Sequence, residues 1–561
     1  KAVKIFSTRG QNSYTPGDII TIKINPNQVQ LLNPYNSYLK FSFLVSGNAR
    51  LSPDERSGAI SCIKNITIKD GTGQHILEQI TEYATLRGVK DYVEQNDSLN
   101  NLKELMEGKQ PSLHNEQNSN VAGTVAGYNL NGGVIGQYWT TLTDNTATMT
   151  ANGNRRVEVV MPFSLSGLLG KKDVKLLPVV LLRGLILEVE LESDVAKVLQ
   201  LNGLRNPQGE MVGYGNPSLA NPATATSQAF FYRGAYVGGA YTGDGIAIPI
   251  GAVNVSSVLL CNRTNDAGGI APPNNALEGG FVNSPFCIGQ SFRVNALADG
   301  TGASQTFGPI TSITVDTASG AGAAGRIRLH FANQNNTSGA ALPGNVIIDS
   351  GVNINANYSI ENVEFIASSV QAPQGYLSSM SKALSKGITM SYQSYRNYPI
   401  NVNAGNLQSS LYIPSKLSRA LSIVSVPSSQ ATSQLHIGDY TPIVGHVSSY
   451  QWLIAGILTP NRAVDLSKTE AGRWDALAQM ENVSAYENQN WVVRNVADMA
   501  SNNFTISRNF SRHNHTYNLG VKGELRLNVN YTALASGLIY NNFISHYKAV
   551  QITNKGIRVL E

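Results

Sequence analysis

The sequence is poor in charged residues, which fill only 14% of its 561 positions, against about 25% in an average soluble protein. Few charges, together with abundant Gly, Asn, Ser and Thr, disfavour long exposed helices and favour strands, turns and an uncharged polar surface. Such a surface suits a protein whose surface is largely covered by neighbouring subunits, because interface cores are depleted in charge. The net charge of +5 includes no block of five like charges, so no dedicated nucleic-acid arm is predicted.

Cysteine and long apolar runs are also scarce. Cys62, Cys261 and Cys287 form a small, odd set, so we expect no disulfide framework and a reducing folding compartment. The longest aliphatic stretch, 176–191, is interrupted by a proline and an arginine and is shorter than the ~20 residues of a membrane span. No signal-peptide pattern opens the sequence. We therefore expect a soluble protein that is not secreted.

Motifs for nucleotide, metal or nucleophilic chemistry are missing or incomplete. Residues 320–325 match G-x-G-x-x-G, but a strand pattern follows where a dinucleotide site needs a helix, so we interpret them as a hairpin loop. His513 and His515 could share one face of a strand, but no third ligand is near, and a polar loop is the favoured interpretation. Residues 163–167 only superficially resemble a nucleophile elbow.

Three carboxylates provide the strongest enzymatic alternative. Glu188, Glu190 and Glu192 are placed to line one face of a strand, as a β-sandwich glycosidase would require. The competing interpretation is an outer sheet face or a subunit contact. We favour the latter, because glycan clefts usually carry clustered Trp and Tyr, whereas this chain has 4 Trp and none in this strand. We predict a non-enzymatic protein with no catalytic, cofactor-binding or metal-binding residues and no cofactor.

What the sequence does contain is alternation of apolar and polar residues, which is typical of half-buried strands. The clearest runs are 20–24, 39–45, 185–191 and 525–531. Helical spacing is limited to short stretches, which we place at 76–95, 98–107, 376–384 and 469–480. The fold class predicted from this pattern is all-β, with strands packed as sandwiches and short helices at their ends.

The chain is too long for a single hydrophobic core, because cores stop growing near ~250–300 residues. Two glycine-led alternating strands, 184–191 and 523–531, echo each other, and each is followed by a further strand before a boundary. We therefore predict one β architecture built twice, as domains 1–372 and 373–561.

Two polar segments interrupt the first domain. The segment at about 203–355 is rich in Gly, Ala, Asn and Ser and contains several strand patterns, so we predict an inserted β module. The segment 115–154 is predicted to be a long loop. Loops of this length usually lie on an exposed surface.

The order of three segments carries a family resemblance. The first half contains VEVVMPFSLSGLLGKKDVKLLPVVLLRGLILEVEL at 157–191, and the second contains YQWLIAGILTPNRAV at 450–464 and NLGVKGELRLNVNY at 518–531. PFCIGQSFRV at 285–294 is similar to part of the inserted module of some members. By order and spacing, most of the chain resembles the double jelly-roll major capsid proteins of the virophage and polinton-like virus group.

The resemblance implies two tandem eight-stranded jelly rolls that stand upright in an icosahedral shell. Three chains would form a pseudo-hexameric homotrimer, and trimers would tile the faces, with penton and minor capsid proteins as further partners. The inserted loops would form external towers. An N-terminal arm at the base would contact a neighbour, a minor protein or the interior, which leaves contact with the genome or an internal membrane open.

The localisation implied is the virion capsid, after assembly in the cytoplasm of the host cell. Two alternatives remain. A β-rich viral fibre or adhesin would share the composition, although neither a short repeat nor a coiled-coil segment is found. A two-domain carbohydrate-active enzyme would use the carboxylates of the strand 185–191 described above.

Overall fold

The computed structural model describes both halves of the chain and part of the inserted segment. The described residues are 1–47 without 9 and 11, 51–53, 57–94, 106–107, 148–149, 155–170, 176–201, 230–237, 240–241, 248, 250–261, 292–295, 303–315, 327–342, 345–348, 356–429, 447–466, 474–476, 478–480, 483, 504–510, 516–522, 524–532 and 537–561. Among them, no helix is long and apolar enough to cross a lipid bilayer.

The first half folds into two antiparallel sheets. The first sheet has six strands: β1 (Ala2–Phe6), β21 (Ala356–Val370) and β4 (Leu31–Gly47) in order, then β9 (Arg155–Pro162) and β10 (Leu177–Pro178) paired with β4, and β2 (Ser13–Tyr14) paired with β21. The second sheet has the order β3 (Ile19–Ile24), β11 (Leu185–Leu191), β6 (Ile63–Asp70) and β7 (Ile76–Ile80).

The second half repeats this arrangement. Its first sheet has the order β22 (Ile388–Val402), β29 (Leu538–Thr553), β24 (Ala420–Ser429) and β27 (Ile506–Asn509), with β30 (Gly556–Leu560) paired with β29. Its second sheet has the order β23 (Gln408–Tyr412), β28 (Leu525–Tyr531), β25 (Val447–Ile454) and β26 (Ile457–Asp465).

The strand order defines the fold of each half. Numbered along the chain, the eight main strands of either half run first-eighth-third-sixth in one sheet and second-seventh-fourth-fifth in the other. This is the jelly-roll order, in which two interleaved Greek keys make a sandwich. The predicted all-β double jelly roll is therefore confirmed, with β2, β10 and β30 as additions to the eight-strand pattern.

The two glycine-led strands that echo each other in the sequence hold the same position in the two sandwiches. Strands β11 and β28 are the seventh strands of their sandwiches, and both alternate between buried and half-buried positions from end to end. Alternate side chains of a strand point to opposite faces of the sheet, so one face of each strand enters a core. In β11, Val189 lies opposite Ile20 on one side and Ile66 on the other, which builds a continuous apolar layer.

The prediction of a helix at 76–95 was partly wrong. The run 76–95 begins as strand β7, and only α1 (Tyr83–Glu94) is helical. Ile80 pairs with Ile66 of the neighbouring strand, so sheet pairing overrides the local spacing. The expected helix at 376–384 is confirmed as α7 (Gln374–Leu384). Of the helix expected at 469–480, residues 474–476 and 478–480 are helical and the others lie outside the described residues.

Short helical turns complete the sandwiches: η1 (Ala59–Cys62), α6 (Val195–Val198) and α10 (Leu519–Lys522). Of the turn expected at 98–107, only residues 106–107 are described, and they are helical. A separate two-stranded sheet joins β5 (Leu51–Pro53) to β12 (Leu199–Leu201). These pieces connect strands without altering the jelly-roll order.

The inserted segment contributes to a sheet of nine strands. The path is β17 (Ser304–Phe307), β16 (Phe292–Asn295), β20 (Asn345–Ile348), β13 (Phe230–Val237), β15 (Val255–Cys261), β19 (Ile327–Gln334), β18 (Ile310–Val315) and β8 (Thr148–Met149), with β14 (Ala240–Tyr241) beside β13. Strand β8 belongs to the stretch 115–154, so the expectation of a simple loop there was wrong at these two residues. Residues 320–325 lie outside the described residues, between the antiparallel neighbours β18 and β19.

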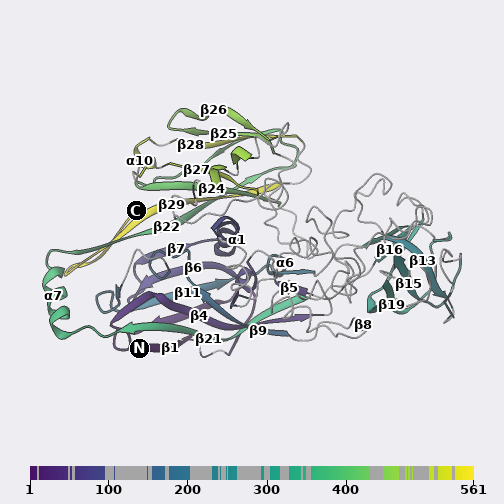
Figure 1. Ribbon diagram of the computed structural model, residues 1–561, viewed down its shortest axis with the longest axis horizontal. Helices are drawn as coiled ribbons and strands as arrows, with labels where there is room; N and C mark the ends of the chain where they lie inside the picture. The colour runs from purple at the N-terminus through teal and green to yellow at the C-terminus, as the bar shows by residue number, and fades with distance from the viewer. Residues whose placement is uncertain are drawn as a thin grey trace.

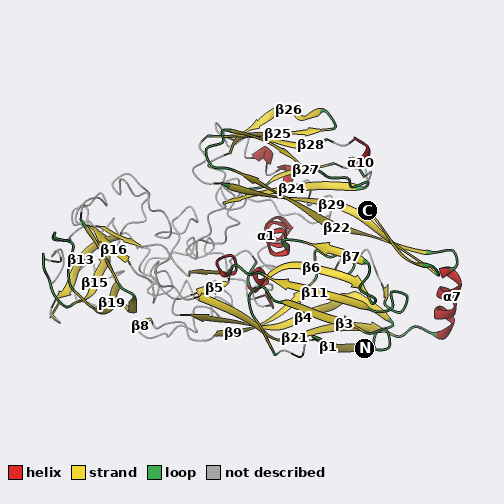
Figure 2. Cartoon of the chain, turned by 180° about the vertical axis from the view of Figure 1, so that it is seen from behind, coloured by secondary structure: helices red, strands yellow, loops and turns green. Residues whose placement is uncertain are grey.

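Figures 1 and 2 show how the parts are arranged. The four sandwich sheets lie in layers, from the sheet of β1 and β21, through that of β6 and β11 and that of β22 and β29, to that of β25 and β26. Helix α7 lies at one end of this block, and the inserted sheet lies at the opposite end. Strand β21 belongs to the first sandwich and β22, the next strand along the chain, belongs to the second. We therefore propose residues 1–372 and 373–561 as the two domains.

Candidate assembly site: the wall between the two sandwiches

The contact between the two sandwiches is built on both faces of one sheet. In the strands β24 and β29, Ile423 and Ile544 belong to the core of the second sandwich. Their neighbours Val424, Val426 and Phe543 belong instead to the large apolar cluster of the first half. Because successive residues point to opposite faces, the β22-β29-β24-β27 sheet is buried on both sides. We call its contact with β7, α1 and residues 163–170 the wall.

A direct hydrogen bond crosses the wall. The hydroxyl of Tyr392 donates to the carbonyl oxygen of Leu77 on β7 at 2.5 Å. The ring is fully buried, and burial raises the pKa of Tyr392 well above its usual value. The hydroxyl therefore stays protonated and serves as a donor, which fixes β22 against the edge strand of the first sandwich.

The wall also requires a close backbone approach at Gly167. A Cβ atom added to this glycine would lie 2.1 Å from the carbonyl oxygen of Gln393 and 2.9 Å from the ring of Tyr392. Only a residue without a side chain fits at this separation. The segment 163–167, which superficially resembles a nucleophile elbow in the sequence, is therefore part of a structural contact.

Glu78 organises the loop that contains this glycine. Its carboxylate is buried and accepts hydrogen bonds from the backbone N–H groups of Gly167 at 2.9 Å and Leu168 at 3.3 Å, and from the hydroxyl of Ser166. Burial raises the pKa of Glu78, and these donors, together with Ser394 of the second sandwich, counteract that effect. A buried acceptor with several donors holds the loop in one conformation.

Helix α1 fills the wall beside this loop. All residues from 83 to 91 are buried, which is unusual for a helix that carries charges. The guanidinium of Arg87 lies 2.9 Å from Asp91 and 2.8 Å from Glu107 and donates to Ser164. Burial alone would lower the pKa of Arg87, but the two carboxylates outweigh it and the pKa is raised.

Across the wall, the ammonium group of Lys90 lies 5.9 Å from the centre of the Tyr395 ring on β22. This is the distance of a cation–π contact. Lys90 and Tyr395 are both buried. The wall therefore combines apolar packing with polar contacts that match one sandwich to the other, which makes the two halves a single block.

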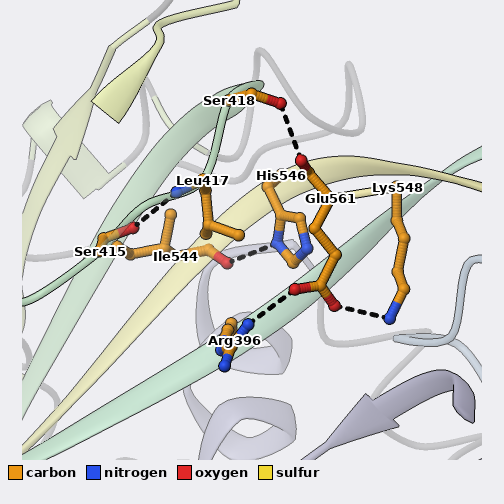
Figure 3. A network of polar contacts seen from close by, with 8 residues as sticks. All are labelled: Arg396, Ser415, Leu417, Ser418, Ile544, His546, Lys548 and Glu561. Atoms are coloured by element: carbon orange, nitrogen blue, oxygen red, sulfur yellow. Dashed lines mark hydrogen bonds and ion pairs between the residues drawn. The ribbon is translucent and has the colours of Figure 1, made fainter. Parts of the chain in front are cut away.

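A second polar network fastens the last strand of the second sandwich (Figure 3). The side chain of Glu561 lies 2.7 Å from both Arg396 on β22 and Lys548 on β29, and the hydroxyl of Ser418 donates to its main-chain oxygen at 2.9 Å. Partial burial would raise the pKa of Glu561, but the cations hold it below its usual value. The buried ring of His546 lies beside this network, and burial lowers its pKa to about 4.

The three carboxylates singled out in the sequence do not come together as catalytic groups. Glu188 forms an ion pair with Lys69 at 2.8 Å, and Glu190 accepts a hydrogen bond from Asn65 at 2.7 Å. Both are half-buried on the outer face of β11. Glu192, which was expected in the same strand, lies one residue beyond the end of β11 at Leu191 and is buried.

Metal ligation finds no support in the described parts of the chain, where no group of three or more His, Cys, Asp or Glu side chains could hold an ion. His513 and His515 lie outside these parts, as does Cys287. Cys62 is buried, and burial raises the pKa of its thiol. Tyr392 and Glu78 match no motif, and Gly167 only completes the apparent nucleophile elbow, so these wall residues could not be identified from the sequence. Only the strand echo indicated that two sandwiches must meet.

No family model matches this chain, and no curated protein is similar to it in sequence. Solved structures are similar in fold. The major capsid protein of Faustovirus aligns at 10% identity and a TM-score of 0.48, over 99% of this chain and 90% of that one. A chain of the Sputnik virophage aligns at 9% and 0.41, over 100% and 88%, and the mavirus major capsid protein at 8% and 0.34, over 100% and 90%. These three TM-scores lie below 0.5, so the assignment to the double jelly-roll class rests on the strand order in each half.

Proposed function

We propose that this chain is a major capsid protein that assembles as a pseudo-hexameric homotrimer and tiles an icosahedral virus shell. The observation that carries the proposal is the repeated jelly-roll order, with the two repeats locked by a buried wall. Three chains of two similar lobes make a six-lobed tile, so identical subunits can fill a hexagonal lattice. The work of such a protein is self-assembly, driven by apolar burial and shape complementarity.

The rigidity of the wall supports this role. Domains joined by small polar contacts usually move relative to each other, and a tile with moving lobes would fit its lattice poorly. Here the Tyr392 hydrogen bond, the Lys90–Tyr395 contact and the close approach at Gly167 all cross the wall and restrain such motion. A non-enzymatic role is supported by Glu188 and Glu190, which are engaged by neighbouring side chains.

The ends of the block suggest its orientation in the shell. The inserted sheet lies at one end and α7 at the other. In the proposed shell, the inserted segment faces outward as a tower, and the end with α7 faces the interior. Penton and minor capsid proteins are the proposed further partners, and the virion, after cytoplasmic assembly, is the proposed location.

The test uses the purified full chain. Native mass spectrometry is expected to show a homotrimer, and negative-stain microscopy is expected to show six-lobed tiles that form sheets or particles as conditions change. A stable monomer at micromolar concentration would contradict the proposal, and elongated rods would favour a fibre or adhesin. A glycan-hydrolysis screen that found activity lost in Glu188→Gln and Glu190→Gln would favour the enzymatic alternative.

A further inference from the structure

The end of the block that carries α7 (Figures 1 and 2) is lined by unpaired cations. Five exposed residues supply them: Lys1, Arg183, Lys382, Lys386 and Lys555. None of the five forms an ion pair with any residue that the structure describes. We call these five residues the basic end.

The second sandwich brings three of these cations together. Lys382 lies on α7, and Lys386 follows the helix after one further residue. Gly387 then lies beside the side chain of Thr553, at the end of β29. The hydroxyl of Thr553 accepts a hydrogen bond from the backbone N–H of Lys555 at 3.3 Å, which places the β29–β30 turn next to the end of α7.

The first sandwich adds the other two cations through the loop 25–30. This loop accepts hydrogen bonds from the hydroxyl of Ser369 and the backbone N–H of Ala372, just before α7. Its proline lies beside the glycine that follows Arg183. Lys1 precedes β1, which pairs with the end of β21. Because the five cations come from distant parts of the sequence, no run of like charges marks them there.

Acidic residues are almost absent from the segments that form this end. The following stretches contain no Asp or Glu: 1–17, 19–53, 176–187, 365–438 and 525–560. Asp70 lies on the loop beside Arg183, but it is buried and accepts hydrogen bonds from the hydroxyl of Thr72 and the backbone N–H of His75. Cations that gather without counter-charges create a positive potential, so this end suits an anionic partner.

Helix α7 shows which kind of anion fits. Its large aliphatic residues Leu377, Met380 and Leu384 are half-buried, and Leu384 packs against the core of the first half. Its exposed positions include these hydroxyl and amine groups: Tyr376, Ser378, Ser379, Ser381 and Lys382. Such groups bind phosphate oxygens of nucleic acids whatever the base sequence. A helix that binds a lipid surface would instead expose its Leu, Phe or Trp side chains.

We propose that the basic end binds the phosphate backbone of a nucleic acid without sequence preference. The inference rests on the proposed function, in which this end faces the interior of the shell and therefore a packaged genome. Lys382 and Lys386 also suit the C-terminal end of the helix dipole, but Lys1, Arg183 and Lys555 do not lie on a helix. A trimer presents three basic ends, which bind one long duplex more tightly than a single chain does.

The salt dependence of binding measures the number of phosphate contacts. Fluorescence anisotropy of a labelled short duplex DNA is recorded with the purified full chain. Each contact contributes about −0.9 to the slope of log K against log salt concentration. Five contacts from one chain therefore predict an affinity loss of about 500-fold between about 50 and 200 mM salt. Two duplexes of unrelated sequence are expected to bind equally, and a strong preference for one would contradict backbone binding.

The decisive variant carries Lys382→Gln and Lys386→Gln together. Its salt slope is expected to be smaller by about 2 for each chain bound, with equal weakening for both duplexes. The matched control carries Lys4→Gln and Lys197→Gln, which remove the same charge from lysines that pair with glutamates at 3.3 and 4.0 Å. The control is expected to bind like the wild type. Equal losses in the two double variants would mean that only total charge matters and would overturn the inference.

Cross-linking and vesicles separate the remaining outcomes. Ultraviolet irradiation of the wild-type complex is expected to attach nucleotides to the segment 374–386, where Tyr376 is the exposed aromatic residue. Binding to phosphatidylserine vesicles but not to the duplex would assign the basic end to a lipid surface and overturn the inference. A trimer that binds neither would also overturn it and leave the capsid proposal intact. A wild type that native mass spectrometry shows to be monomeric would instead remove the proposed function.

Discussion

The hydroxyl of Tyr392 and the carbonyl oxygen of Leu77 are 2.5 Å apart, although the two residues are separated by more than 300 positions in the sequence. This hydrogen bond joins the first strand of the second sandwich to the edge strand of the first. It lies in the wall that makes the two jelly rolls one body. The first prediction concerns this bond.

Tyr392→Phe removes the donor and leaves the carbonyl of Leu77 buried without it. An unsatisfied buried acceptor costs about 1–3 kcal/mol, so the free energy of unfolding is expected to fall by about that amount in a denaturant titration. Tyr376→Phe on the exposed helix α7 is the control, because Tyr376 is 49% exposed and should leave stability unchanged. Equal stabilities for the two variants would show that the bond contributes nothing to the wall.

Gly167→Ala tests the closeness of the two sandwiches. The new methyl group would lie 2.1 Å from the carbonyl oxygen of Gln393, so the wall must open or shift. Overpacking typically costs about 1–3 kcal/mol, and faster hydrogen exchange is expected in α1 and β22. Gly375→Ala in α7 meets nothing within 4 Å and should be neutral or slightly stabilising, since Ala favours helices. Unchanged exchange in the first variant would contradict the close contact.

Arg87→Met tests the buried charge cluster. The substitution leaves the carboxylates of Asp91 and Glu107 buried without their cation, and breaking such a cluster costs about 3–5 kcal/mol. Arg396→Met is the matched control, because its pair with Glu561 is exposed at 51% and 38% and exposed pairs contribute at most about 1 kcal/mol. Chemical denaturation of both variants gives the comparison, and a mild effect at Arg87 would mean that the cluster is solvated.

The buried ring of His546 predicts acid sensitivity. Its pKa is lowered to about 4 from the model-peptide value of 6.5, so the unfolded chain binds a proton that the folded chain does not. Above pH 6.5 the ring is neutral in both states and does not reduce the free energy of unfolding. As the pH falls from 6.5 to 4, the unfolded chain takes up a proton and the free energy of unfolding decreases. At about 1.36 kcal/mol for each pKa unit, the loss approaches about 3 kcal/mol.

The variant His546→Phe isolates this contribution. Its stability is expected to change less than that of the wild type between pH 6.5 and 4, whatever its absolute value. Lys548 and Arg396, the main cations that hold the pKa of Glu561 below its usual value, remain in the variant, so most of the Glu561 contribution is common to both proteins. Parallel pH profiles of urea unfolding would show that the imidazole is protonated in the folded protein.

Much of the fold could be predicted because it rests on local alternation. The run Leu185–Leu191 and its echo Leu525–Tyr531 each present one apolar face, and both are seventh strands in their sandwiches. The stretch 76–80 was mistaken for helix because a short apolar run satisfies either period, and only pairing with β6 decides between them. Glu192 was placed in the strand because alternation does not show where a strand ends, and β11 ends at Leu191.

The sequence by itself determined that strands would dominate, that they would form two similar sandwiches, and that no familiar catalytic motif was present, because alternation and spacing are local properties of the chain. Only the tertiary structure decided how the sandwiches meet. Tyr392, Glu78 and Gly167 are far apart in sequence and become partners only when β7, β22 and the loop 163–170 are brought together. These contacts stabilise the fold because they are buried, and they are buried only when all these elements are in place.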